Sequence, residues 1–189
     1  MKRIRPLAIL LLFFSLTGCA GSSRYMRPAQ LNNVQLSPDK ATVYFLRPSS
    51  YGFAINFQVW DGDKFIGLSQ AKSYFAYQCQ PGKHLFMAFS ENKVAVEADL
   101  EAGKSYYIGT NVRTGMWKAR VGFTPVTRGS ALWDTVENYK QSLHFLALNE
   151  AEAASWQEAK RDESRAIMDY FTKGEGRASL LYLHKEDGR

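Results

Sequence analysis

The sequence predicts a mainly β protein: an antiparallel β-sandwich or small barrel of seven to eight strands, with a C-terminal helical extension. Three observations predict this fold class. Between residues 40 and 127, apolar and polar residues alternate with a period of two, as in half-buried strands. Turn-forming residues separate these runs at regular spacing, which is typical of sandwiches and barrels. Beyond residue 128 the apolar residues recur at three- and four-residue steps, the spacing of one helix face.

Up to eight segments of the region 40–127 have the period of a strand. Their ranges are 41–46, 55–60, 65–68, 73–79, 84–89, 93–100, 105–112 and 117–124. The sequence Asp61-Gly62-Asp63-Lys64 predicts a hairpin between the second and the third, because glycine tolerates positive φ. Pro81-Gly82 predicts the turn that closes the fourth.

Two helices and one more strand are predicted in the rest of the chain. Apolar residues at helical spacing span 132–146, with Ser130 as a candidate N-cap. Asn149 begins a capping-box-like sequence that opens a second helix, and Gly174 ends that helix. Residues 179–184 fit either a last strand or a frayed helical piece, and the strand is favoured.

The composition is that of a globular protein. Of the 189 residues, 46% are hydrophobic and 22% are charged, which argues against disorder. Two cysteines exclude a disulfide-rich scaffold, and no apolar run reaches the roughly 18–20 residues of a spanning helix. The 24 basic residues exceed the 18 acidic ones, but three of the basic residues lie before residue 6. The rest of the chain is therefore only weakly basic, and we expect no nucleic-acid partner.

The first residues have the pattern of a bacterial export signal. Three basic residues precede an apolar run over 7–16, which is too short to span a membrane. The run ends in Leu16-Thr17-Gly18-Cys19, which resembles the lipobox of bacterial lipoproteins. The resemblance implies that the thiol of Cys19 takes a diacylglyceryl group and that the new amino group takes a further acyl chain such as palmitate. The alternative is an ordinary secretory signal that is cleaved near Ala20.

Cleavage before Cys19 divides the chain into four regions. Residues 1–18 are the predicted signal peptide, 19–39 the lipidated N-terminus and a polar tether, 40–127 the β domain and 128–189 the helical extension. Ala20, in place of an aspartate, resembles the lipoproteins that are sorted to the outer membrane of Gram-negative bacteria. Two or more acyl chains hold a protein stably on a bilayer, so we expect the membrane to be a partner.

Five motifs of the β domain carry a second resemblance. They are Val43-Tyr-Phe-Leu-Arg-Pro48, Val59-Trp-Asp-Gly-Asp-Lys64-Phe-Ile-Gly67, Ser73-Tyr-Phe75, Pro81-Gly-Lys-His84 and Leu100-Glu-Ala-Gly-Lys-Ser-Tyr-Tyr107. Together they resemble bacterial proteins catalogued as a domain of unknown function, many of which carry a lipobox. The order of strand, hairpin and Pro-Gly turn also resembles small PEGA-type β domains. Over residues 41–126 the resemblance implies an extracytoplasmic β domain, and it implies no activity.

Cys79 departs from the family pattern, in which an aliphatic residue is expected at this position. Its alternation places it on the same face as Phe75 and Tyr77, so a buried cysteine that packs as a small hydrophobe is the favoured interpretation. The alternative is a lone thiol that pairs with a partner protein in an oxidising periplasm.

The sequence contains no set of residues that predicts catalysis or metal binding. The three histidines are far apart and lack companions at metal-ligand spacing, so His84 is expected to brace its turn. Asp61 and Asp63 supply only two carboxylates, whereas Ca²⁺ takes six to eight oxygens. We therefore predict no catalytic residue, no metal and no cofactor except the lipid at Cys19.

Aromatic residues make up 14% of the chain, and four of them fall opposite the predicted core face: Tyr44, Trp60, Tyr74 and Tyr106. Two interpretations of these four remain open. Either the C-terminal helices and the core cover them, or they form an exposed platform that stacks on sugar rings or docks an apolar partner. On the second interpretation they are the candidate binding surface.

These expectations combine into one functional hypothesis. The protein is expected to be a non-enzymatic lipoprotein on the periplasmic face of the outer membrane, with a binding or scaffolding role in the cell envelope. The expected partner is an envelope protein or a cell-wall glycan. The alternatives are a glycan- or peptidoglycan-binding module that uses the four aromatic residues and, less favoured, an envelope hydrolase.

Overall fold

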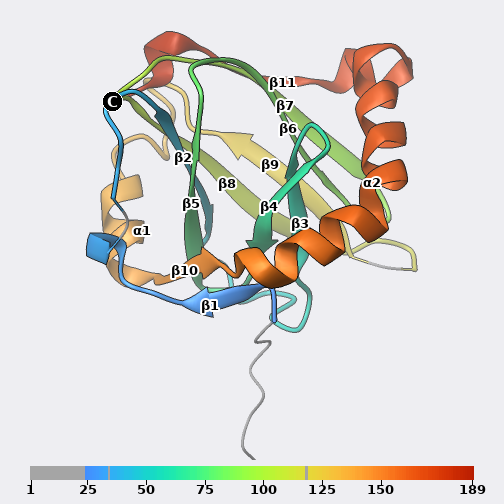
Figure 1. The fold of residues 1–189 in the computed structure, drawn as a ribbon, viewed down its shortest axis with the longest axis horizontal. Coiled ribbons are helices and arrows are strands. Elements are labelled where there is room, and N and C mark those ends of the chain that lie inside the picture. Colours follow the sequence, from blue (N-terminus) through green and yellow to red (C-terminus); the bar gives the residue numbers. More distant parts are fainter. Residues whose placement is uncertain (1–23, 34, 118) are drawn as a thin grey trace, which may run out of the picture.

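The computed structural model describes residues 24–33, 35–117 and 119–189, and the lipobox residues Leu16, Thr17, Gly18 and Cys19 lie outside them (Figure 1). The described residues form eleven strands, which are β1 Met26–Pro28, β2 Ala41–Arg47, β3 Phe57–Asp61, β4 Lys64–Ser69, β5 Ser73–Cys79, β6 Gly82–Phe89, β7 Lys93–Leu100, β8 Ser105–Arg113, β9 Arg120–Pro125, β10 His144–Leu148 and β11 Leu181–Leu183. They also form the α-helices α1 Val136–Ser142 and α2 Glu150–Thr172 and the short 3-10 helices η1 Leu31–Asn33, η2 Glu175–Ser179 and η3 Lys185–Asp187. None of the helices in this part of the chain combines the length and the apolar character needed to cross a membrane.

The strands form two mixed sheets and not a closed antiparallel barrel. In the described chain one sheet has six strands in the order β1-β10-β5-β2-β8-β9, and the other has five in the order β11-β7-β6-β3-β4. Most neighbours are antiparallel, but β10 with β5, β2 with β8 and β11 with β7 are parallel. The expectation of purely antiparallel pairing is therefore wrong. These three pairs join segments that are far apart in the sequence, which requires long crossovers in place of hairpins.

All eight strands predicted in the region 40–127 are present, as β2 to β9. The predicted hairpin is confirmed, because Asp61 pairs with Lys64 and Gly62 has a φ of 58°. Two strands start later than predicted. β3 begins at Phe57 instead of residue 55, and β9 begins at Arg120 instead of residue 117. The residues in between belong to two loops, which are described below.

The first predicted helix, over 132–146, is wrong at both ends. α1 is only seven residues long, its N-cap is Thr135 and not Ser130, and Leu146 lies in strand β10. β10 inserts between β1 and β5 in the six-stranded sheet. Backbone pairing with two partner strands outweighs the local helical spacing, and periodicity alone cannot reveal such partners.

The second predicted helix and the last predicted strand are confirmed as α2 and β11. Asn149 is the N-cap of α2, but its side chain makes no capping hydrogen bond to the helix. Its amide instead donates to the backbone carbonyl of Arg24, 3.1 Å away. The start of α2 is thereby joined to the N-terminal segment.

Part of the predicted tether is built into the fold. β1 pairs with β10, and Met26 is buried in the main core. Tyr25 packs against Trp156 of α2, with 5.1 Å between the ring centroids. The expectation of a free polar linker over residues 19–39 is therefore wrong for residues 24–28.

The region 128–189 adds one strand to each sheet. β10 lies inside the six-stranded sheet, and β11 forms an edge of the five-stranded sheet. Phe171 of α2 and Leu183 of β11 are buried in the same core as residues of β2 to β9. The backbone of Arg189 exchanges two hydrogen bonds with Ser105 at the start of β8, of 2.9 and 3.0 Å. Through these contacts the C-terminal region packs in the same core and the same sheets as β2 to β9.

The main core draws side chains from both sheets, and each helix covers further apolar surface. Phe45 of β2 meets Phe86 of β6 edge to face, with 5.5 Å between the ring centroids. α1 lies beside the six-stranded sheet and α2 lies along the five-stranded sheet (Figure 1). A second, smaller core lies at α1, where Leu46 of β2 packs with Val136 and Leu143.

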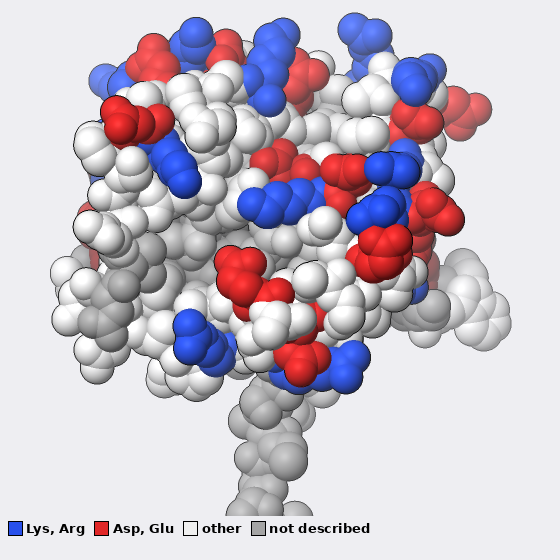
Figure 2. Space-filling model, viewed as in Figure 1, with Lys and Arg blue, Asp and Glu red and all other residues white. Residues whose placement is uncertain are grey.

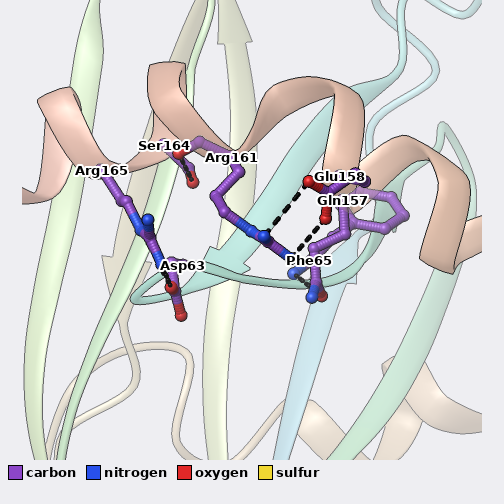
Figure 3. Close-up of polar contacts among 7 residues, drawn as sticks. All are labelled: Asp63, Phe65, Gln157, Glu158, Arg161, Ser164 and Arg165. Carbon is purple, nitrogen blue, oxygen red and sulfur yellow. Dashed lines mark hydrogen bonds and ion pairs between the residues drawn. The ribbon is translucent and has the colours of Figure 1, made fainter.

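α2 also covers the edge strand β4. The side-chain oxygen of Gln157 accepts the backbone N–H of Phe65 at 3.0 Å, and Arg165 donates two hydrogen bonds of 3.1 and 3.2 Å to the carboxylate of Asp63 (Figure 3). An uncovered edge strand presents unpaired backbone groups to other chains, so this helix protects the sheet. Over α2 the surface carries interspersed charges of both signs (Figure 2).

Candidate functional site

The four aromatic residues proposed as a binding surface are buried. Tyr44 is 2% exposed and Tyr74 4%, and both Trp60 and Tyr106 are 0% exposed. A platform on these residues is therefore ruled out. The other interpretation, that the helices and the core cover them, is the one that the structure supports.

Tyr44 and Tyr74 lie in the smaller core at α1. The ring of Tyr44 stacks on that of Tyr107 with 5.2 Å between centroids, and the ammonium of Lys140 lies 4.8 Å from the Tyr44 ring. The hydroxyl of Tyr107 donates to Glu137 of α1 at 3.0 Å. Burial raises the pKa of both Tyr44 and Tyr74, so their hydroxyls stay neutral.

Trp60 and Tyr106 belong to the main core, where their polar ends have partners. The indole N–H of Trp60 donates to the side-chain oxygen of Gln58 at 3.2 Å, and Trp156 of α2 donates to the same oxygen at 3.2 Å. The hydroxyl of Tyr106 accepts the backbone N–H of Glu101 at 2.9 Å. These side chains hold the fold together and are closed to a ligand.

Five of the seven exposed large apolar side chains of the described residues gather instead in two loops. Tyr51, Phe53 and Ile55 lie between β2 and β3, and Met116 and Trp117 lie between β8 and β9. Phe53 is 70% exposed and Trp117 is 88% exposed. We call these five residues the apolar loop patch. Apolar surface that is exposed in one place on a protein marks an interaction site.

The first loop is braced from below by a buried arginine. Arg47, at the end of β2, is only 1% exposed. One of its terminal nitrogens donates to the carbonyls of Ile55 and Ser69 at 2.6 and 3.1 Å. The other donates to the carbonyls of Tyr51 and Gly52 at 3.0 and 2.8 Å. Burial lowers the pKa of Arg47 to about 10, so the guanidinium keeps its charge at neutral pH.

The second loop is braced by a carboxylate. Glu91, in the turn between β6 and β7, accepts the backbone N–H groups of Met116 and Trp117 at 3.0 and 2.8 Å. It also accepts a hydrogen bond of 3.0 Å from Arg120. The tip of the loop is therefore held although its side chains point into solvent.

The two loops meet and border two hollows. The hydroxyls of Tyr51 and Thr114 are 2.7 Å apart and join the loops. A hollow of about 460 Å³ lies between them, lined by Tyr51, Ile55 and Trp117 among others. A second hollow of about 440 Å³ lies beside Phe53 and reaches Met26 of β1.

Each of these hollows has one charged side chain in its described lining, and it is basic. Arg113 lines the first hollow, and Lys72 lines the second beside His144. The nearest carboxylate of the patch is Glu91, which holds the backbone of Met116 and Trp117 and forms an ion pair with Arg120.

A separate polar cluster joins Asp61 and His84. The Nδ1–H of His84 donates to the Asp61 carboxylate at 2.7 Å, and its Nε2–H donates to the carbonyl of Gln80 at 2.8 Å. The hydroxyl of Tyr77 donates to the same Asp61 oxygen at 3.0 Å. The hydrogen bond to Asp61 raises the pKa of His84 to about 10, so the ring is an imidazolium at neutral pH. His84 braces the Pro-Gly turn, as predicted.

Two nucleophilic side chains of the strands, Cys79 and Ser69, are enclosed. Cys79 is buried, and its sulfur lies 3.9 Å from the carbonyl of Ala41, so the interpretation as a small buried hydrophobe is confirmed. The hydroxyl of Ser69 is buried and lies 2.5 Å from that of Thr110. Among the described residues no group of three or more His, Cys, Asp or Glu side chains could hold a metal ion.

Comparison with known proteins adds no assignment. No family model matches the chain, and no curated protein is significantly similar to it. The resemblance to the bacterial family of unknown function therefore stays a prediction.

The apolar loop patch could not be predicted from the sequence, for a physical reason. The alternation that begins at Trp117 fits a strand, and a tryptophan in such a pattern is normally a core residue. The residues around Phe53 contain Ser, Gly and Tyr, which predict a loop but not its exposed apolar tip. One signal was present, namely the arginine at the end of the otherwise apolar strand β2, since a buried arginine needs a ring of acceptors.

Proposed function

We propose that this protein is a lipid-anchored component of a Gram-negative cell envelope with a non-catalytic binding role. In this proposal the lipid is attached at Cys19, and the protein lies on the periplasmic face of the outer membrane. The two sheets pack as a β-sandwich that serves as a rigid body. The apolar loop patch is its binding surface.

The braced loop patch is the observation that carries this proposal. Arg47 and Glu91 fix the backbones of the two loops, so Phe53 and Trp117 are presented in a defined arrangement. A surface that is already ordered loses little conformational entropy when it binds, which favours affinity. Exposed aromatic side chains on ordered loops are therefore better explained by recognition than by packing.

The polar groups support binding in preference to catalysis. His84 is held as an imidazolium by two acceptors and has no free nitrogen to take a proton. Ser69 and Cys79 are buried in strands and bonded within the fold. The envelope-hydrolase alternative gains no support from these groups, and the glycan-binding alternative loses the four aromatic residues on which it rested.

Substitution of Cys19 tests the anchor. Cys19→Ser removes the thiol that takes the lipid, so the protein is expected to move from the membrane fraction to the soluble periplasmic fraction. Cys79→Ala is the matched control, because that cysteine is buried and should leave the fractionation unchanged. Mass spectrometry of the mature protein reads the modification directly. An unmodified residue 19 in membrane-bound material would contradict the proposal.

A further inference from the structure

We propose that the apolar loop patch rests on the lipid bilayer and that its aromatic side chains enter the headgroup region. The lipid at Cys19 and the patch would then contact the same membrane at two points, which fixes the orientation of the domain. This inference rests on the proposed function, because it takes the acylated Cys19 as the first contact.

The distance between Cys19 and the folded body is short. The described chain starts at Arg24, and Tyr25 and Met26 already pack against α2 and the main core. Four residues lie between Cys19 and Arg24, so the two Cα atoms are five steps apart along the chain and cannot be separated by more than about 18 Å. The anchor therefore holds the nearest surface of the domain close to the bilayer.

That nearest surface includes the apolar loop patch. Met26 and Pro28 of β1 line the same hollow as Phe53 and Ser50. β1 and the turquoise loop between β2 and β3 lie along the same edge of the molecule, which is the lower edge in Figure 1. The β8–β9 loop is joined to this edge through the contact between Tyr51 and Thr114. The N-terminal entry strand and the β2–β3 part of the patch thus share one edge of the protein, and the β8–β9 part, at the right in Figure 1, adjoins it.

The chemistry of the patch fits the interface of a bilayer. Tryptophan and tyrosine are enriched at the headgroup level, where an apolar ring and a polar group are both accommodated. Arg113 and Lys72 at the rims can meet anionic headgroups. The one carboxylate at the patch, Glu91, is paired with Arg120 and with the backbone of Met116 and Trp117. The patch has the composition of an interfacial contact, with apolar side chains flanked by basic ones.

Because the lipid supplies the affinity, the patch is needed for orientation. Acyl chains alone leave a domain free to rotate on its linker. Loops that are braced by Arg47 and Glu91 can enter the interface without first becoming ordered. A second contact of this kind holds the sheets at a constant angle to the membrane.

Depth-dependent fluorescence quenching tests the contact in the intact lipidated protein. The protein is reconstituted into vesicles of equimolar phosphatidylethanolamine and phosphatidylglycerol, with a fraction of the lipids brominated near the headgroup end of the acyl chains. Of the four tryptophans, Trp60 is buried, Trp133 and Trp156 are half-buried and Trp117 is exposed, so Trp117 should account for most of the quenching. We expect quenching of the wild-type protein and its loss in Trp117→Phe. Equal quenching of the two proteins, or no quenching of wild-type protein that floats with the vesicles, would overturn the proposal.

A second measurement separates this proposal from the anchor. Cys19→Ser lacks the lipid, so any binding to the same vesicles reports the patch alone. We expect weak binding that falls by about tenfold when Phe53→Ser and Trp117→Ser are added. Tyr182→Ser is the matched control, because Tyr182 is an exposed aromatic residue on β11, outside the loop patch, and should have no effect.

The outcomes are distinguishable. If the wild-type protein does not float with vesicles and residue 19 is unmodified, the proposed anchor is wrong. The Cys19→Ser variants would still show whether the apolar loop patch binds the membrane. If Cys19→Ser binds vesicles no better than the variant that also carries Phe53→Ser and Trp117→Ser, the membrane contact of the patch is wrong and the proposed anchor is unaffected. A third outcome is that purified cell wall retains the wild-type protein but not Trp117→Phe, and that vesicles give no quenching. This outcome would assign the loops to glycan binding and overturn the membrane contact.

Discussion

His84 is kept in its charged form by acceptors on both sides of its ring. A carboxylate faces Nδ1 and a backbone carbonyl faces Nε2, so either neutral tautomer would leave one acceptor without a hydrogen. The same Asp61 carboxylate also accepts the hydroxyl of Tyr77, whose pKa is raised by burial and by the negative charge of Asp61. One ion pair thus ties together β3, β5 and β6. The sequence indicated a brace at His84, but it did not reveal Asp61 as the partner, because the contact depends on the pairing of β3 with β6.

The pH dependence of stability should report this ion pair. The folded-state pKa of about 10 lies above the ordinary value of 6.5, so the contribution of His84 is fully present below about pH 6.5 and is lost as the pH rises towards 10. At about pH 6 we expect His84→Gln to lower the free energy of unfolding by about 2 kcal/mol. By about pH 9 the difference from wild type should have become much smaller. Urea unfolding at both pH values measures it, and a difference that does not change with pH would contradict the assignment.

Among the elements, α2 shows how a predicted helix can have an unpredicted role. Its length and limits follow from the sequence, but its contact with strand β4 does not. Strands β2 to β9 could be predicted because each alternates over several residues. β10 could not, since its apolar residues also fit the helical spacing that precedes them, and β1 has only three residues. β1 is defined by its pairing with β10, and β10 also by its pairing with β5, which is information that a local pattern does not contain.

The two polar contacts between α2 and the β3–β4 hairpin should differ in their energies. Gln157→Ala leaves the backbone N–H of Phe65 without its acceptor, so we expect it to cost about 1 kcal/mol of stability. Asp63→Ala breaks the exposed ion pair with Arg165, for which we expect a change below about 0.5 kcal/mol. Urea denaturation of the two variants gives both values. A larger loss for Asp63→Ala than for Gln157→Ala would show that the ion pair, and not the backbone cap, holds the helix on the sheet.

At the scale of the whole molecule, the two ends of the chain complete the two sheets. β1 and β10 extend the six-stranded sheet beyond β5, and β11 extends the five-stranded sheet beyond β7. α2 contributes Ile167 and Phe171 to the main core, in which residues of both sheets meet. The expected division at residue 127 rested on a change of hydrophobic period, which marks a change of secondary structure and not an end of packing.

Deletion of residues 128–189 should therefore destroy cooperative folding. It removes the apolar side chains of α2 and β11 from the core and leaves both sheets with uncovered edges. A loss of one large buried side chain already costs about 2–5 kcal/mol, which is a large part of the stability of an ordinary domain. We expect the shortened protein to show no sharp thermal transition by calorimetry or near-ultraviolet circular dichroism, whereas the full chain shows one. A sharp transition in the shortened protein would mean that residues 40–127 fold alone.

The pairing of Met26 with Leu148 also sets the time at which this protein can reach its native state. The most N-terminal strand finds its partner only when most of the polypeptide is available, and contacts between such distant segments form slowly. Under the proposed export this delay is useful, because a translocation channel admits an unfolded chain. With the lipid anchor that we propose, the strand order favours completion of the sheet after translocation.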